Sequence, residues 1–181
     1  VLVLQPSLDG YSLNQYCLTG PEGNFVFLFV GNERAILFDT GPVAFQPFKD
    51  IVAQLVPDAA SHDLIIAHTH SHGDHIKGDT LWEDEAAGRT KGPFRSVTIV
   101  GLSPEEVSQF YTLDFDPGES REDATSVYDL GGRALQLFWI RGHEDSHIAV
   151  YDESVNVLVT GDVLYPGETS SLLCALHTTI I

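Results

Sequence analysis

The chain is poor in positive charge. Nine Lys and Arg residues stand against 26 Asp and Glu residues, which gives a formal net charge of −17 over 181 residues. Proteins that bind nucleic acids through phosphates need clustered Lys and Arg, and segments recruited to anionic membranes are polybasic. Apolar runs also stay well short of the about 20 residues that a membrane-spanning helix requires. The sequence therefore argues against a nucleic-acid partner and against a membrane partner.

Cysteine and methionine are scarce as well. The two cysteines, Cys17 and Cys174, form neither a CxxC pair nor a disulfide framework, so they do not indicate a redox compartment. Methionine is absent, and the opening VLVLQP lacks the basic residues and cleavage signature of a signal peptide. The cytoplasm is slightly favoured, and a secreted or periplasmic location applies if a signal peptide has been removed. The sequence does not predict the oligomeric state.

What is present is a globular composition, with 43% hydrophobic and 19% charged residues. No repeat, low-complexity tract or linker divides residues 1–181, and this length suits one domain. A chain of this size buries about 70% of its unfolded surface on folding. We therefore expect a single domain with its own hydrophobic core.

Runs of aliphatic, aromatic and β-branched residues predict the strands. They are expected over residues 11–18, 24–30, 34–39, 63–67, 97–100, 134–140, 147–151 and 155–160. Helices are expected over residues 45–55, from apolar spacing, and after Ser103, where Glu106 completes a capping box. Residues 83–93 and 114–123 are expected to be loops, and the last fifteen residues have no clear partner element. This order favours an α/β protein in which two packed sheets carry helices outside.

The segment HTHSHGDH, residues 68–75, holds four histidines and an aspartate directly after an expected strand. Imidazole and carboxylate are the usual ligands of zinc. Residues two apart in an extended segment face the same way, so His70 and His72 can converge on one ion. The glycine that follows them permits a sharp turn, which can direct Asp74 and His75 to a second position. The segment therefore predicts a metal site.

The order HSHGDH at residues 70–75 matches the HxHxDH motif of the metallo-β-lactamase superfamily, which the chain resembles. Three further elements occur in the family's order: Asp39 in FDTGP, His143 after a glycine, and Asp162 in TGDVLYPG, each near the end of an expected strand. The resemblance extends over about residues 11–167. It implies the family's αββα sandwich of two mixed sheets flanked by helices.

The resemblance also implies a dinuclear site and a role for each residue. The first metal would be held by His70, His72 and His143. The second would be held by Asp74 and His75, with Asp162 bridging both ions. Asp39 would accept a hydrogen bond from a ligand histidine and so fix its tautomer.

The sequence departs from the family's usual pattern in two places. The GH element continues with Glu-Asp-Ser-His147, so His147 either reaches the metal or begins the next strand. The family normally supplies a last metal histidine after the GD element, and here only nineteen residues follow it, with His177 as the sole candidate. We therefore expect that the chain is truncated or rearranged at its C-terminus, or that the second metal site is built differently. Of the other histidines, His68 is expected to pack behind the ligands, and His62 is expected to be solvated.

Bound zinc lowers the pKa of water from about 15.7 toward about 7, and Asp74 is placed to orient that nucleophile and receive its proton. The resemblance implies a metal-dependent hydrolase of a small-molecule ester, lactone, thioester or β-lactam that acts through a metal-bound hydroxide. Two zinc ions are expected, a single ion is the alternative, and the ligands also suit iron and manganese. Two other interpretations stay open: a catalytically weak, incomplete metal-binding member of the fold, and a mononuclear iron dioxygenase-like member.

Overall fold

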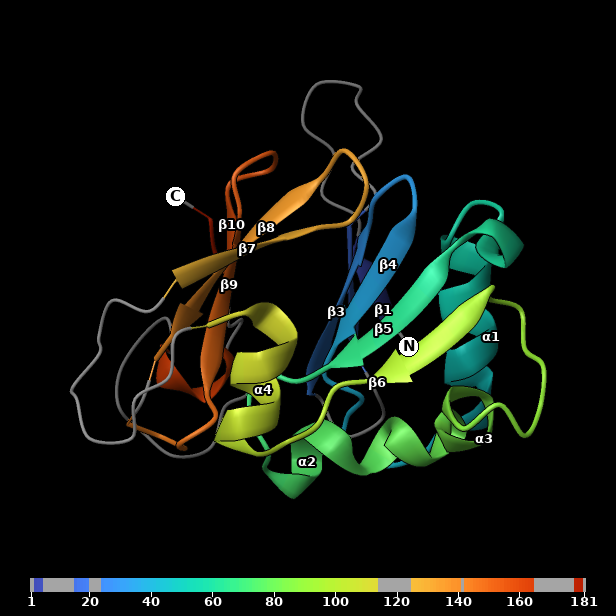
Figure 1. Cartoon of the computed structure of the whole chain (residues 1–181), viewed down its shortest axis with the longest axis horizontal. Helices are drawn as coiled ribbons and strands as arrows, with labels where there is room; N and C mark the ends of the chain where they lie inside the picture. Colours follow the sequence, from blue (N-terminus) through green and yellow to red (C-terminus); the bar gives the residue numbers. More distant parts are fainter. Residues whose placement is uncertain are drawn as a thin grey trace.

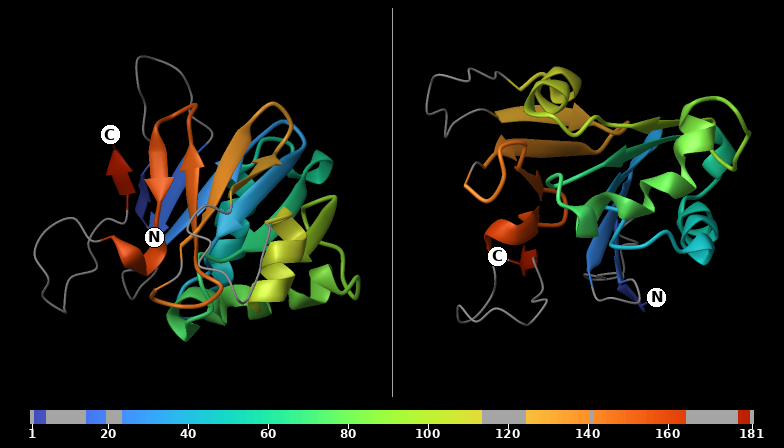
Figure 2. Two further views of the ribbon diagram at one scale, coloured as in Figure 1. Left: turned by 60° about the vertical axis from the view of Figure 1, so that its left-hand side comes forward. Right: turned by 90° about the horizontal axis from the view of Figure 1, so that it is seen from below.

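Two β-sheets pack against each other, and helices flank this sandwich (Figures 1 and 2). The computed structural model describes residues 2–4, 15–19, 24–113, 125–140, 142–164 and 178–180. Most of the expected strands are present within one or two residues of their predicted bounds. No helix in this described part of the chain is both long enough and apolar enough to cross a membrane.

The first sheet has the strand order β1-β2-β3-β4-β5-β6. Its strands are β1 (Leu2–Leu4), β2 (Gln15–Thr19), β3 (Phe25–Val30), β4 (Arg34–Phe38), β5 (Asp63–Ala67) and β6 (Ser96–Ile99). The pairs from β1 to β4 are antiparallel, whereas β4, β5 and β6 run parallel. Parallel neighbours need a crossover connection. The crossovers are supplied by α1 (Gln46–Leu55) with η1 (Ala59–Ser61), and by α2 (Gly73–Ile76), η2 (Lys77–Leu81) and α3 (Glu83–Ala86).

The second sheet is antiparallel, with the order β11-β10-β9-β8-β7. Its strands are β7 (Thr125–Asp129), β8 (Ala134–Trp139), β9 (Ile148–Asp152), β10 (Val157–Val159) and β11 (Thr178–Ile180). A short helix, η3 (Gly161–Val163), follows β10 directly. Helix α4 (Pro104–Tyr111) contributes Val107 and Tyr111 to the core between the sheets.

Strands β3, β4 and β5 of the first sheet are buried on both faces, which explains their continuous apolar runs. Along β3, Phe27 and Phe29 belong to the core between the sheets, whereas Val26, Leu28 and Val30 belong to a second core. That second core lies under the helices and includes Phe48 and Val52 of α1 and the buried Trp82 between η2 and α3. Adjacent strand residues face opposite sides of a sheet, so one strand serves two cores.

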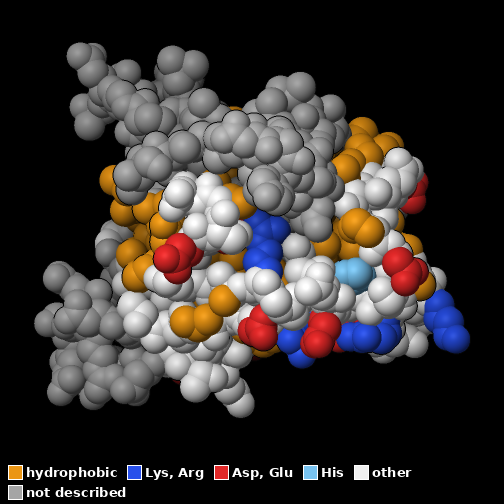
Figure 3. Space-filling view, turned by 90° about the horizontal axis from the view of Figure 1, so that it is seen from above, with side chains coloured by type: hydrophobic (Ala, Val, Ile, Leu, Met, Phe, Trp, Pro, Cys, Tyr) orange, Lys and Arg blue, Asp and Glu red, His pale blue; other side chains and the backbone are white. Residues whose placement is uncertain are grey.

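The two sheets are joined at one end by their turns. The β3–β4 turn donates from the Asn32 amide to the Gly131 carbonyl (2.8 Å) and from the Glu33 amide to the Leu130 carbonyl (3.0 Å). A Cβ on Gly31 would lie 2.3 Å from the Leu130 oxygen, so only glycine fits there. Figure 3 views the molecule from this end, where Lys and Arg side chains lie beside Asp and Glu side chains.

A buried ion pair strengthens the same junction. The Arg133 guanidinium donates to Asp152 (Nε to Oδ2, 2.7 Å) and to the Val30 carbonyl of the first sheet (3.2 Å). The Asp152 side chain is fully buried, and the Arg133 side chain is 9% exposed. A charge in the interior needs such a partner, because burial without one costs several kcal/mol.

Four expectations for secondary structure need correction. Residues 83–86 form α3, where Glu85 makes a buried ion pair with Lys49 of α1. The strands β1, β7 and β11 were not predicted. β7 is an edge strand whose residues alternate between exposed and half-buried, and β11 pairs with β10 near the end of the chain. The acidic loop 114–123 lies outside the described residues.

A fifth correction concerns His62, which is buried rather than solvated. Its Nε2 lies 3.1 Å from the Gly31 carbonyl and its Nδ1 lies 3.2 Å from the Asp58 carbonyl. A neutral imidazole donates to only one of these carbonyls, and its Nδ1 also lies 3.2 Å from the Ser61 hydroxyl. The ring is therefore held by the scaffold.

Candidate metal centre

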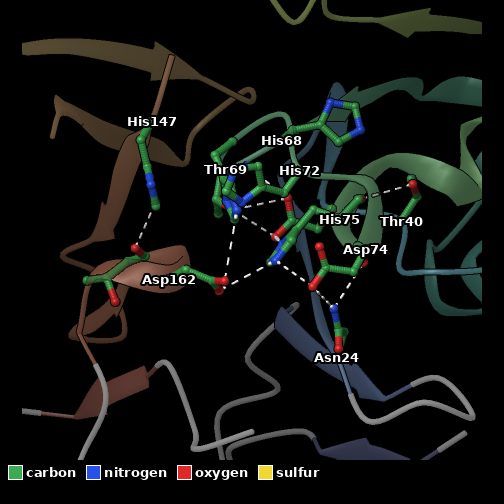
Figure 4. A network of polar contacts seen from close by, with 12 residues as sticks. Asn24, Thr40, His68, Thr69, His72, Asp74, His75, His147 and Asp162 are labelled. Atoms are coloured by element: carbon green, nitrogen blue, oxygen red, sulfur yellow. Dashed lines mark hydrogen bonds and ion pairs between the residues drawn. The ribbon is translucent and has the colours of Figure 1, made fainter. Parts of the chain in front are cut away.

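The predicted site residues all follow the ends of strands. Asp39 comes directly after β4, and the histidine segment follows β5. Asp74 and His75 lie in α2, while His143 lies between β8 and β9 and Asp162 lies in η3 after β10. Both sheets therefore contribute side chains to one place (Figure 4).

One group of side chains consists of His70, His72 and His143. Their potential ligand nitrogens all lie within 4.8 Å of one another. The His143 Nε2 is 3.0 Å from the His72 Nδ1, and the His70 and His143 ring centroids are 4.8 Å apart. His70 is buried, whereas the other two rings are exposed, so this group opens to solvent.

A second group overlaps the first and consists of His70, His75 and Asp162, again with ligand atoms within 4.8 Å. Asp162 places Oδ1 3.5 Å from the His75 Nε2, and its Oδ2 lies 4.0 Å from the His70 Nε2 and 3.7 Å from the His143 Nε2. Asp162 thus lies between the two groups. Asp74 is at the rim, with a half-exposed side chain whose Oδ2 is 3.7 Å from the His75 Nε2.

The donor set fits a metal ion. The His70 Nε2 is buried and has no hydrogen-bond partner among the described residues. A buried polar atom of this kind needs an explanation, and a cation surrounded by imidazole and carboxylate donors provides one. The structure brings five of the six predicted ligands together and puts the sixth, Asp74, beside them.

Asp39 orients this arrangement from behind. It accepts from the Thr69 amide (Oδ1, 2.8 Å) and from the Thr69 hydroxyl (Oδ2, 2.9 Å). Its Oδ2 also lies 2.9 Å from the His75 Nδ1. A carboxylate at Nδ1 favours the tautomer in which that nitrogen carries the proton, which leaves Nε2 facing Asp162. The left-handed backbone of Asp39 (φ 68°) is one that Asp tolerates better than most residues.

The electrostatics of the metal-free protein divide the histidines. Burial lowers the pKa of His75, but hydrogen bonds and charges from Asp162 and Asp39 outweigh it and raise that pKa to about 10. Burial, together with the charges of His75 and His147, lowers the pKa of His70 to about 3. At neutral pH without metal, His75 is therefore a positively charged imidazolium, whereas His70 is a neutral imidazole.

Other residues support the site. His147 is fully buried; its Nε2 lies 3.0 Å from the Thr160 carbonyl, and its ring stacks on the His70 ring. His68 lies behind the site, where its Nε2 is 2.9 Å from the Asp79 Oδ1, an oxygen that also accepts from the Thr40 hydroxyl. His177 lies outside the described residues.

Asn24 and Thr69 escaped the sequence analysis. Asn24 donates from Nδ2 to the Asp74 carbonyl (3.0 Å) and to the Asp74 Oδ2 (3.2 Å), as Figure 4 shows. Nothing in the sequence around Asn24 indicates this contact, because the two residues are 50 positions apart. The position of Thr69 inside the histidine segment was the only available signal for that residue.

Residues 19–180 match the family described as the metallo-beta-lactamase superfamily. The chain is 26% identical to the acyl-coenzyme A thioesterase MBLAC2 of Homo sapiens, over 78% of this chain and 58% of that protein. It is 26% identical to the beta-lactamase-like protein 2 homolog of Caenorhabditis elegans, over 86% of this chain and 49% of that one. The atrochrysone carboxyl ACP thioesterase AgnL7 of Paecilomyces divaricatus is 21% identical, over 83% and 42%. The chain thus spans about half the length of these relatives.

Solved structures agree in fold. ETHE1 from Myxococcus xanthus superposes with a TM-score of 0.51 at 23% identity, covering 83% of this chain and 57% of that chain. BJP-1, a subclass B3 metallo-beta-lactamase of Bradyrhizobium japonicum, gives 0.50 at 21% identity, covering 78% and 55%. The expected sandwich of two sheets flanked by helices is thereby confirmed. From the family match and the fold together, the chain belongs to the metallo-β-lactamase superfamily.

Proposed function

We propose that this chain is a metal-dependent hydrolase that cleaves a thioester, or a similarly activated acyl bond, in a small-molecule substrate. The observation that carries the proposal is the pair of overlapping ligand groups that share His70 and meet at Asp162. Two adjacent positions for cations are what a two-zinc hydrolase needs. Relatives that are named thioesterases favour the thioester among the acyl substrates.

Each residue would contribute in a distinct way. One ion would be held by His70, His72 and His143, and the other by His75, Asp74 and Asp162, with Asp162 within reach of both. Zinc bound there would lower the pKa of water and polarise a carbonyl oxygen. Asp39 would keep the His75 Nε2 directed at the site through its contact with Nδ1 (2.9 Å).

Asp74 is the residue suited to proton transfer. Its side chain is 53% exposed, so solvent water reaches it. A carboxylate in that position can hydrogen-bond to an entering water and accept its proton. A thiol has a pKa of about 8.5, so a thioester releases its leaving group with less help from an acid than an amide does.

The test combines metal analysis with a substrate panel. Protein of verified mass is stripped of metal and reloaded with Zn²⁺, Fe²⁺ or Mn²⁺, and each form is assayed with an acyl-coenzyme A thioester, a p-nitrophenyl ester and nitrocefin. We expect two zinc ions per chain and thioester hydrolysis that EDTA abolishes and zinc restores. Asp74→Asn should lower kcat by about 10²–10⁴-fold, the usual effect of losing a proton-transfer group.

Other results would overturn the proposal. One ion per chain without turnover of any substrate indicates a catalytically weak member of the fold. A single iron with oxygen-dependent turnover of a sulfur substrate indicates the dioxygenase-like alternative. A chain that binds no metal excludes the proposed chemistry altogether.

A further inference from the structure

Asn24 makes a two-point contact with Asp74. The carboxamide nitrogen lies 3.0 Å from the Asp74 carbonyl oxygen and 3.2 Å from the Asp74 Oδ2. A carboxamide NH₂ has two hydrogens, so one group can serve both acceptors of the same residue. Asn24 is half-buried immediately before β3, whereas Asp74 lies in α2.

Among the described residues, Asn24 is the one whose side chain hydrogen-bonds to Asp74. Helix α2 has four residues and no side-chain cap, and the Asp74 side chain is 53% exposed. An exposed carboxylate rotates freely among staggered conformers unless another group fixes it. The Asn24 contact fixes both the main chain and the side chain, and it does so with Oδ2, the oxygen that lies 3.7 Å from the His75 Nε2.

We propose that Asn24 is a positioning residue, whose carboxamide holds the Asp74 carboxylate toward His75 and thereby builds the second metal position. The inference rests on the proposed function, because it assigns Asp74 to the metal centre. It adds a requirement that the ligand set alone does not contain, namely a hydrogen-bond donor at residue 24. The nitrogen of Asn24 is what matters, since its hydrogens occupy both Asp74 acceptors.

The chemistry of the side chain separates this role from simple packing. Asn24→Asp keeps the shape but replaces the donor by a carboxylate beside the two Asp74 oxygens, whereas Asn24→Ala removes the donor and leaves room for water. Positioning by hydrogen bonding predicts that the Asp variant is worse than the Ala variant. Packing predicts the opposite order, because Asp and Asn have the same size.

Stepwise titration of metal-free protein with Co²⁺, followed by visible absorption, provides a readout independent of turnover. We expect Asn24→Ala to weaken the second equivalent by about 10–100-fold, the usual cost of losing a partner of a metal ligand. Asn24→Asp should weaken it further, and the first equivalent should stay within about threefold of wild type. Tyr151→Phe is the matched control, because it removes one exposed hydrogen bond (to Asn156, 2.9 Å) from the β9–β10 turn.

The outcomes distinguish this inference from the function it rests on. If wild-type protein binds two ions and hydrolyses thioesters but both Asn24 variants bind the second ion normally, the positioning role is wrong and the proposed function stands. Equal loss of both equivalents together with a lower Tm shows a general structural role and also overturns the inference. If wild-type protein binds no second ion, the positioning role fails, and the proposed function fails with it only when no substrate is turned over.

Discussion

The His147 ring lies almost parallel to the His70 ring, with centroids 4.6 Å apart and planes inclined by 12°. His147 is completely buried, and its Nε2 contacts the Thr160 carbonyl two residues before Asp162. The His147 imidazole therefore supports two predicted ligands: His70, which follows a strand of the first sheet, and Asp162, whose segment follows a strand of the second sheet. His147 is in contact with the candidate centre without belonging to either ligand group.

Replacing His147 with alanine should cost about 3 kcal/mol of stability, because it leaves a cavity and an unpaired carbonyl. It should also weaken metal binding, since His70 loses its support. Urea unfolding of the metal-free protein and zinc competition measure the two effects. His62→Ala is the control. This histidine is also buried and also contacts backbone carbonyls, but it lies beside the β3–β4 turn, at the end where the turns join the sheets. His62→Ala should lower the free energy of unfolding but leave the zinc affinity unchanged. Equal zinc affinities in the His62 and His147 variants would contradict the role given to His147.

Asp39→Asn should weaken the second metal equivalent by about 10–100-fold through its effect on His75. Asn tolerates the left-handed backbone of this position, so the change tests the charge rather than the conformation. In metal-free protein the same change should lower the pKa of His75 from about 10, measured by NMR titration. Asp58→Asn is the control, since Asp58 is also left-handed (φ 48°) and its side chain is exposed. An unchanged His75 pKa in Asp39→Asn would refute the coupling.

Metal binding near neutral pH should release about one proton from His75, because its raised pKa keeps it protonated while a ligand must be neutral. Affinity should therefore rise with pH up to about 10. Calorimetric titration in buffers of different ionisation enthalpy measures the released proton. Heats that do not depend on the buffer would show that His75 is already neutral.

The same group makes a prediction for stability without metal. The folded-state pKa of His75 is raised above its usual 6.5, so its contribution is fully present below pH 6.5 and is lost as pH rises toward 10. Metal-free protein should lose a few kcal/mol over that window in urea unfolding. Asp39→Asn should flatten the profile, and a wild-type profile that is already flat would count against the His75 assignment.

Arg133→Met should destabilise the protein by about 3–5 kcal/mol, because it leaves the Asp152 carboxylate buried without its partner. The matched comparison is Arg95→Met, which breaks a surface pair with Asp63 (2.6 Å, side chains 52% and 29% exposed). Exposed pairs contribute about 0–1 kcal/mol. Denaturant unfolding of the two variants should differ clearly, and similar losses would show that burial does not govern the Arg133 pair.

The sequence predicted the parts of the fold that depend on local pattern. The doubly buried strands β3, β4 and β5 are continuous apolar runs, and the α4 capping box has both of its hydrogen bonds, as the Ser103–Glu106 spacing predicts. The edge strand β7 lacks that signal because most of its residues face solvent. A buried acidic side chain in α3 depends on Lys49, more than thirty positions earlier, which no local pattern records.

The candidate site divides in the same way. The spacing of residues 70–75 indicated which side chains converge, and the structure brings them close to His143 and Asp162. The contacts that orient these side chains depend on how distant segments pack. The sequence therefore did not predict the contact of Asn24 with Asp74, and it indicated His147 only as a departure from the family pattern, not as a support for His70.

The docking of the β3–β4 turn on the β7–β8 turn has a mechanical consequence. Strand β3 reaches these joined turns at Val30 and begins beside Asn24, which contacts Asp74 of the candidate metal centre. The joined turns and the centre are therefore separated by about 20 Å, the length of six extended residues. The sandwich is thus fastened at one end by its own backbone. At the other end, a cation bound by residues from both sheets would hold the two halves together. Amide hydrogen exchange around η3 and α2 should therefore be slower in the metal-bound than in the metal-free protein. Exchange at the β3–β4 and β7–β8 turns should stay slow in both states.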